Sequence, residues 1–222
     1  VTTPEGGKVF LIAPNVENTG VITSPKGEVV LAAGHAVQLV DSSNPELRVV
    51  VSAPGGEAVN LGQVIAQGGK IGIYGALVRQ RGTLNANSAV RGADGRIVLK
   101  ASGDTVLEAG SVTSATGAGT GGQVSVLGQR VALTGDARID ASGNEGGGTV
   151  LVGGDYQGKN TAVMNARQAW VGKDARIKAD AIASGNGGKV IVWSDQATRM
   201  FGDISARGGV AGGNGGLVET SG

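Results

Sequence analysis

A repeat of three short apolar segments constrains the fold of this chain more than any other feature. The stretch 121–143, GGQVSVLGQRVALTGDARIDASG, holds such segments at Val124, Val131 and Ile139, separated by Gly, Asp or Gln-Arg. Segments and separators of this kind are typical of short β-strands joined by tight turns. The same unit begins again at 147–152, GGTVLV. A unit this small cannot bury its apolar face alone, but stacked copies can.

The repeat extends along the whole chain when the first strand of each unit is aligned on its leading apolar residue. Most units are close to the 26 residues that separate Ile71 from Ile97, and a glycine stands two positions before every leading residue. The leading residues are Val9, Val29, Ile71, Ile97, Val124, Val150, Val190 and Val218. We expect them to stack in one column of the core. We expect the glycines to supply a positive φ or a tight corner at the entrance to each strand.

A second register keeps the same phase. It is a Gly-x-apolar pattern in which alanine twice replaces glycine, and a small residue often follows two positions later. The apolar members are Ile22, Val64, Leu84, Val112, Ile139, Ile177 and Ile204, and the small residues are Ala66, Ala86, Ser114, Ala141, Ala179 and Ala206. Two registers in phase indicate a genuine repeat.

Three strands per unit, parallel in successive units, predict an all-β right-handed parallel β-helix. We expect a three-sheet solenoid of about seven to eight coils that hides its strand edges except at the two ends. The 42 glycines and the low aromatic content of 3% suit tight turns and a narrow interior. We interpret 1–222 as a single domain, with an extra hairpin at 41–58 and a loop insertion at 154–168.

Composition excludes several classes of function. Nineteen basic and 18 acidic residues give a net charge of +1, and no basic block indicates a nucleic-acid partner. Zero cysteines exclude disulfides and thiolate metal sites. The N-terminus lacks the features of a signal peptide, which leaves a cytosolic chain or a true start further upstream.

Apparent cofactor motifs do not meet their structural requirements. A P-loop-like stretch at 153–159 continues with Asn160 where Ser or Thr is needed, and a dinucleotide-like stretch at 117–122 leads into a strand instead of a helix. A calcium-loop-like stretch at 140–151 has Leu151 in place of the bidentate glutamate, and His35 has no evident catalytic partners. We predict no metal, no cofactor and no catalytic residue.

The chain resembles the filamentous haemagglutinin family, the large exoproteins secreted by two-partner systems of Gram-negative bacteria. The resemblance is carried by LIAPNVENTGVITSPKGEVVLAAG (11–34), RVVVSAPGGEAVNLGQVIAQGG (48–69), IDASGNEGGGTVLVGGDYQG (139–158) and GNGGKVIVWSDQATRMFGDISARGG (185–209). It covers the end of that family's secretion domain and the coils that follow. It implies a secreted or cell-surface protein, exported by an outer-membrane partner transporter, that serves as an adhesin or as the stem of a longer exoprotein.

Two other interpretations remain open beside a non-enzymatic rod. One is a carbohydrate-active β-helix enzyme, a lyase or hydrolase, that would use acidic residues such as Asp140, Asp155 and Asp195 and a sugar platform of Trp170 and Trp193. The carboxylates share no phase, however, and turn positions explain them more simply. The other is a fibre subunit that associates end to end through its exposed strand edges.

The second insertion holds the candidate contact surface. Loops on a rigid scaffold often carry recognition, and a host-cell or carbohydrate receptor is a candidate partner. The polar and aromatic residues gathered there are Asp155, Tyr156, Lys159, Asn160 and Arg167. The competing interpretation is that both insertions cover apolar surface on one sheet.

Overall fold

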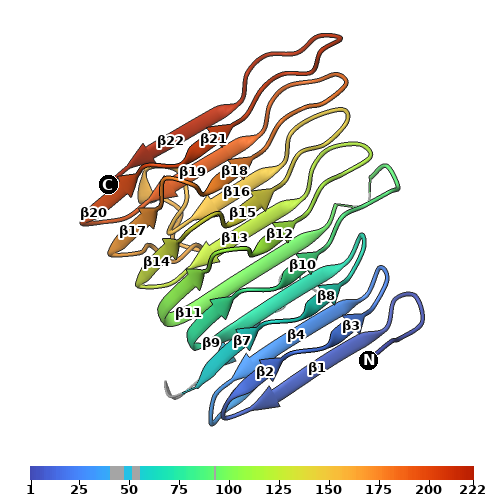
Figure 1. The fold of residues 1–222 in the computed structure, drawn as a ribbon, viewed down its shortest axis with the longest axis vertical. Coiled ribbons are helices and arrows are strands. Elements are labelled where there is room, and N and C mark those ends of the chain that lie inside the picture. Colours follow the sequence, from blue (N-terminus) through green and yellow to red (C-terminus); the bar gives the residue numbers. More distant parts are fainter. Residues whose placement is uncertain (41–47, 52–55, 93) are drawn as a thin grey trace.

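The chain forms an all-β solenoid. The computed structural model describes all residues except 41–47, 52–55 and 93. In this described part, 22 strands are joined by turns and by one short 3-10 helix, η1 (Tyr156–Gly158). Every strand outside a single hairpin pairs in parallel with strands of the neighbouring coils. Figure 1 shows these coils lying side by side from the N-terminal to the C-terminal end of the molecule.

Three ladders of parallel strands run along the molecule. Ladder 1 contains β1 (Lys8–Ala13), β4 (Glu28–Ala33), β9 (Lys70–Gln80), β11 (Arg96–Leu107), β13 (Gln123–Leu127), β16 (Thr149–Val152), β19 (Lys189–Trp193) and β22 (Leu217–Ser221). Ladder 2 contains β2 (Val16–Asn18), β7 (Glu57–Asn60), the second halves of β9 and β11, β14 (Arg130–Leu133), β17 (Gln168–Val171) and β20 (Ala197–Met200). Ladder 3 contains β3 (Val21–Thr23), β8 (Gln63–Ile65), β10 (Thr83–Asn85), β12 (Val112–Ser114), β15 (Arg138–Asp140), β18 (Arg176–Lys178) and β21 (Asp203–Ser205).

Ladders 1 and 2 are joined in one sheet, where the sequence predicted separate sheets. β9 and β11 each continue through the corner, so the described strands form a 13-stranded sheet and a 7-stranded sheet beside the hairpin. The corner of β11 carries an irregularity between Ala101 and Asp104, opposite Gly75 and Leu77 of β9. Small residues at this corner allow both strands to bend without ending.

The eight leading residues pair in one unbroken register, as the sequence predicted. Each residue pairs with the next in the series Val9, Val29, Ile71, Ile97, Val124, Val150, Val190 and Val218. All but the last are at most 8% exposed. Val218 is 45% exposed because it lies on β22, the last strand of the ladder. The predicted column of the core is therefore confirmed.

The second register is shifted by one residue at β12. Thr113, and not the predicted Val112, pairs with Leu84 and Ile139 and is fully buried. The small buried residue that follows is Ala115 instead of Ser114. Gly110 has a φ of +78° and lies in the turn before the strand, so it does not occupy the position of the other glycines in this register.

Six of the eight glycines before the leading residues are required by close stacking on the preceding coil. None of the eight has a positive φ, so that part of the expectation is wrong. A Cβ on Gly148 would instead collide with the carbonyl oxygen of Gly122, one coil earlier. The same oxygen accepts a hydrogen bond of 2.9 Å from the Thr149 N–H. Only glycine leaves room for that hydrogen bond. The expected tight corner is therefore a close contact between the backbones of consecutive coils.

A ladder of buried amides lies inside the first three coils. Asn18 Nδ2 donates to Asn60 Oδ1 at 2.8 Å, and Asn60 Nδ2 donates to Gln80 Oε1 at 2.8 Å. Gln80 Nε2 donates to the carbonyl oxygen of Gly82 at 2.8 Å. The three side chains are at most 7% exposed, and the position becomes apolar at Leu107, which pairs with Gln80. Buried amides are tolerated here because each one has a partner.

An antiparallel hairpin lies against the outer face of ladder 1. It consists of β5 (Val37–Val40) and β6 (Arg48–Val51), and β6 contacts β4 and β9. Val30 and Ala32 of β4 lie outside the main core but are only 1% and 0% exposed. The predicted insertion at 41–58 falls partly outside the described residues and reaches into β7, so its boundaries remain a proposal.

The alternation of inward and outward residues predicts two contrasting substitutions. Val124→Asp places an unpaired charge in the fully buried column and should cost several kcal/mol of unfolding free energy. Thr149→Asp is the matched control, because Thr149 is half-buried and pairs with the polar Gln123. Thermal unfolding should show a large loss for the first variant and a small change for the second. Equal losses would contradict the assignment of the two faces.

The stacked glycines predict a second contrast. Gly148→Ala should destabilise the protein by about 1–3 kcal/mol, because its methyl group meets backbone atoms of the preceding coil. Gly20→Ala is the control, since a Cβ there has open space around it and the backbone is not left-handed. That variant should stay within about 1 kcal/mol of the parent. Urea unfolding of both variants gives the comparison, and an unchanged midpoint for Gly148→Ala would contradict the stacking argument.

Candidate functional site

The loop between β16 and β17 brings together four of the five predicted contact residues. Asp155 is its centre: one carboxylate oxygen accepts from the Tyr156 N–H at 2.7 Å and from Lys189 Nζ at 2.8 Å. The other accepts from Asn160 Nδ2 at 2.9 Å. Lys159 Nζ donates to Gln157 Oε1 at 2.6 Å beside them. Because Lys189 belongs to β19, Asp155 ties the loop to the solenoid.

The fifth residue, Arg167, lies at the other end of the loop. Its backbone N–H donates to the carbonyl oxygen of Gln129 at 2.7 Å, directly before β17 begins. Its side chain is exposed, as are those of Tyr156, Lys159 and Asn160. The structure therefore gathers four of these residues around η1, and their role in contact with a partner remains a proposal.

The pKa of Asp155 is lowered by its hydrogen bonds. Burial alone would raise the pKa, but the donors Asn160, Lys189 and Tyr156 outweigh it, and the positive charge of Lys189 acts in the same direction. The carboxylate form is the one that the loop binds. Its contribution to stability is therefore complete above the ordinary pKa of 3.8 and is lost as the pH falls through the lower value of the folded protein.

The loop also covers Trp193. A Cβ on Gly154 or Gly158 would meet the Trp193 indole, so the loop backbone lies directly against this ring. Asp195 Oδ1 accepts from Trp193 Nε1 at 3.2 Å and from Asn165 Nδ2 at 3.1 Å, which joins the loop to the end of β19. Leu151 and Ile191, on the outward side of ladder 1, are 3% and 0% exposed. These contacts favour the interpretation of the loop as a cover.

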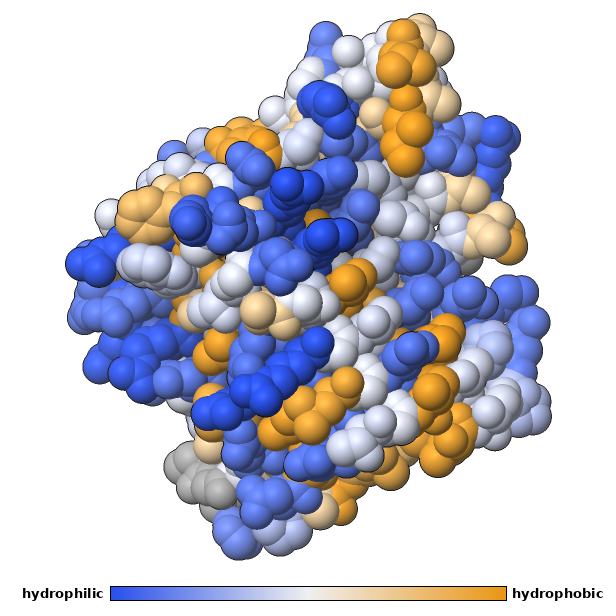
Figure 2. Space-filling model, in the orientation of Figure 1, coloured by the Kyte–Doolittle hydropathy of each residue, from blue (hydrophilic) through white to orange (hydrophobic). Residues whose placement is uncertain are grey.

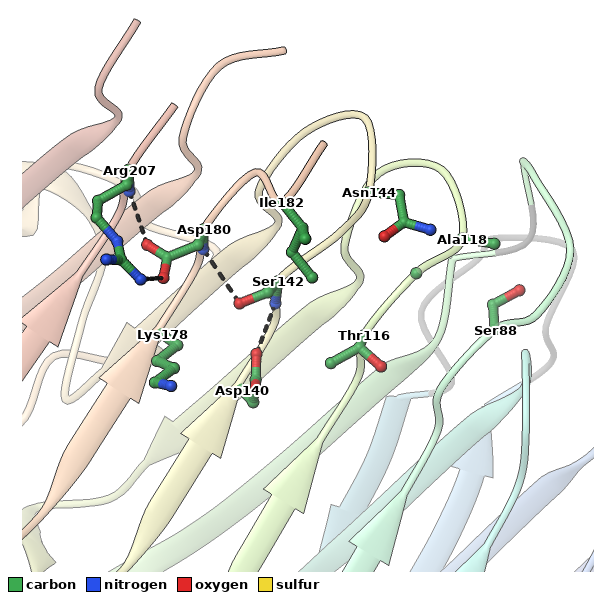
Figure 3. A pocket seen from close by; sticks show the side chains of 11 residues that line it. Ser88, Thr116, Ala118, Asp140, Ser142, Asn144, Lys178, Asp180, Ile182 and Arg207 are labelled. Atoms are coloured by element: carbon green, nitrogen blue, oxygen red, sulfur yellow. Dashed lines mark hydrogen bonds and ion pairs between the residues drawn. The ribbon is translucent and has the colours of Figure 1, made fainter. Parts of the chain in front are cut away.

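A polar hollow of about 440 Å³ lies beyond the ends of β15 and β18. Figure 3 shows Asp180 pointing toward Arg207, with Ser142 and Asp140 continuing the chain of hydrogen bonds. Asp180 accepts from the Arg207 N–H at 2.7 Å and from its guanidinium at 3.0 Å. This pair was not predicted from the sequence, although the two residues lie one repeat apart in the chain.

The Asp180 carboxylate has a structural role. Burial alone would raise its pKa, but the hydrogen bonds from the Arg207 N–H, the Ser205 hydroxyl and the Arg207 guanidinium lower it below the ordinary value. A 6% exposed carboxylate held by donors from the next coil joins two coils. It is not poised to take up or release a proton near neutral pH.

The acidic residues suggested for an enzyme do not gather. Asp140 lies on ladder 3, Asp155 is bound to Lys189, and the exposed Asp195 accepts hydrogen bonds from Trp193 and Asn165. Among the described residues, no three His, Cys, Asp or Glu side chains are placed to hold a metal ion. His35 is exposed. Within the same part of the chain, no helix has the length and hydropathy of a membrane span.

Apart from the neighbouring rings of Trp170 and Phe201, the large exposed apolar side chains are scattered. They include Ile12, Val90 and Ile182. Figure 2 shows that polar residues divide the apolar surface into small patches on the face that it draws. Scattered apolar residues are normal on protein surfaces, so a continuous apolar interface is not indicated on that face.

The chain resembles a solved structure in both fold and sequence. It is the crystal structure of the HMW1 secretion domain from Haemophilus influenzae, with a TM-score of 0.88 and 36% sequence identity. The likeness covers 100% of this chain and 59% of the other. No protein-family model matches the chain, and no curated protein matches it.

The fold and this similarity define the class of protein. The parallel ladders and the stacked repeat define a β-helix, and the similarity in sequence relates it to a secretion domain. The chain resembles the filamentous haemagglutinin family, as the sequence predicted, through its similarity to the HMW1 secretion domain. It spans about three fifths of the length of the structure that it matches.

The bound carboxylate of the loop predicts a pH dependence. Asp155→Asn should lower stability at neutral pH by about 1–3 kcal/mol, because Lys189 loses a partly buried, charged partner. The difference from the parent should shrink as the pH falls below 3.8, because protonation then removes the same interaction from the parent. Urea unfolding at several pH values measures it. Asp174→Asn, at an exposed turn, should match the parent throughout.

Proposed function

We propose that this chain is part of the secretion domain of a larger bacterial exoprotein, exported by an outer-membrane partner transporter. The observation that carries the proposal is the 36% identity with the HMW1 secretion domain over the whole of this chain. In that role the chain is a non-enzymatic, right-handed β-helical segment. Its site of action is outside the cell, at the bacterial surface or in the medium.

The arrangement of the coils supports a role as a rod or stem. Inward residues continue in register from β1 to β22, so the solenoid can extend by adding coils of the same kind. The loop at 154–168 and the hairpin lie against ladder 1 without interrupting this register. The dispersed carboxylates support a rod over the alternative of a carbohydrate-active enzyme.

An export assay tests the proposal. The full exoprotein is produced in a Gram-negative host with and without its partner transporter, and the protein in the medium is measured by immunoblot. We expect export only with the transporter, and we expect its loss when residues 1–222 are replaced by an unrelated β-helix with the same number of coils. Intracellular amounts of both proteins serve as the control. Unchanged export of the replaced protein would contradict a role in secretion.

A further inference from the structure

The outer face of ladder 2 holds a hollow of about 390 Å³ around Trp170. Trp170 points outward from β17 and is 40% exposed. Ala132 pairs with Trp170 in the register, and Val106 pairs with Ala132, so all three lie in one outward column. Val106 and Ala132 form an apolar floor beside the Trp170 ring. Trp193 lies under the loop at 154–168, whereas Trp170 is accessible.

The indole of Trp170 is held in place by its neighbours. The ring centroids of Trp170 and Phe201 are 4.9 Å apart, with the planes inclined by 52°. The backbone of β17 is bound on both sides, by β14 and β20. An aromatic ring on a paired strand loses little conformational freedom when a ligand stacks on it.

Charged and polar groups border this floor. Arg130 donates to Asp104 through Nε at 2.8 Å and through a terminal nitrogen at 2.6 Å, which fixes both side chains. The guanidinium has five N–H donors, so several of them remain for a ligand. Gln168 adds an amide, and Arg199, which pairs with Trp170 from β20, also lines the hollow. The charge of Asp104 neutralises that of Arg130, so the positive charge of Arg199 is the net charge of this site.

We propose that the hollow binds a hexuronate unit of an acidic polysaccharide. A pyranose ring has an apolar face of C–H groups that can stack on the exposed indole, while its hydroxyl groups project from the rim. The Asp104–Arg130 pair and Gln168 supply donors and acceptors for these hydroxyls. A hexuronate carries its carboxylate in the mean plane of the ring, directed sideways. Arg199, on the strand next to Trp170, matches that position and that charge.

The proposal is independent of secretion, because it concerns binding by the folded chain. The purified 222-residue chain, labelled with ¹⁵N, is titrated with trigalacturonate and separately with maltotriose, and the indole N–H signals are followed by NMR. The chain has two tryptophans, so Trp193 serves as an internal reference. We expect trigalacturonate to shift the Trp170 signal and to leave that of Trp193 in place. We expect maltotriose to bind at least about tenfold more weakly, since it has no carboxylate for Arg199.

Three variants separate stacking from charge. Trp170→Ala should abolish trigalacturonate binding, which is then followed by calorimetry. Arg199→Gln should reduce trigalacturonate affinity to that of maltotriose, and Trp193→Phe should bind like the parent. Each of these side chains lies outside the core column, and a thermal unfolding curve for each variant confirms folding.

The proposal is overturned by any of three results. One is no shift of the Trp170 signal at millimolar trigalacturonate. Another is equal affinity for the neutral and the acidic sugar. The third is binding retained by a folded Trp170→Ala variant.

Discussion

Hydrogen bonding between consecutive coils is the constraint on which the rest of this structure depends. Outside the hairpin, the strands pair with equivalent strands of the neighbouring coils, at the spacing of about 4.8 Å that parallel strands require. Equivalent residues therefore lie directly above one another, as Val124 does on Ile97. A residue that suits one coil must suit its neighbours, which is why the repeat is visible in the sequence. A shift by one residue would exchange the two faces, so extra segments enter between strands, as between β16 and β17.

The same stacking explains which predictions succeeded and which failed. The column from Val9 to Val218 was predictable, because burial selects similar apolar residues at equivalent positions. The role of glycine was not, because glycine serves two physical purposes here. Gly148 is needed for the space above Gly122, whereas Gly110 adopts a positive φ in a turn. Both kinds of glycine produce a Gly-x-apolar pattern. The sequence therefore predicted Val112 as the buried residue, whereas Thr113 occupies that position.

Polar contacts were harder to predict than apolar ones. The amide ladder of Asn18, Asn60 and Gln80 was missed because amides are expected on the outside, although each of these residues precedes a glycine by two positions. The cluster around Asp155 was predicted as a set because its members are close in sequence. Its partner Lys189 lies one coil away, so the attachment of the loop to the solenoid required the three-dimensional structure.

The outer faces of ladders 1 and 2 differ in the segments that cover them. The hairpin and the loop at 154–168 both lie against ladder 1, where the loop packs on Trp193 and the hairpin contacts β4 and β9. These irregular segments extend the packing of the core. The outward column of ladder 2 has no such cover at Trp170, which remains 40% exposed although it lies beside the apolar Ala132. An outward position in a solenoid does not determine the fold, so its side chain is free to serve recognition. The regular strands of this β-helix, more than its insertions, thus offer the rigid surface on which a ligand can stack.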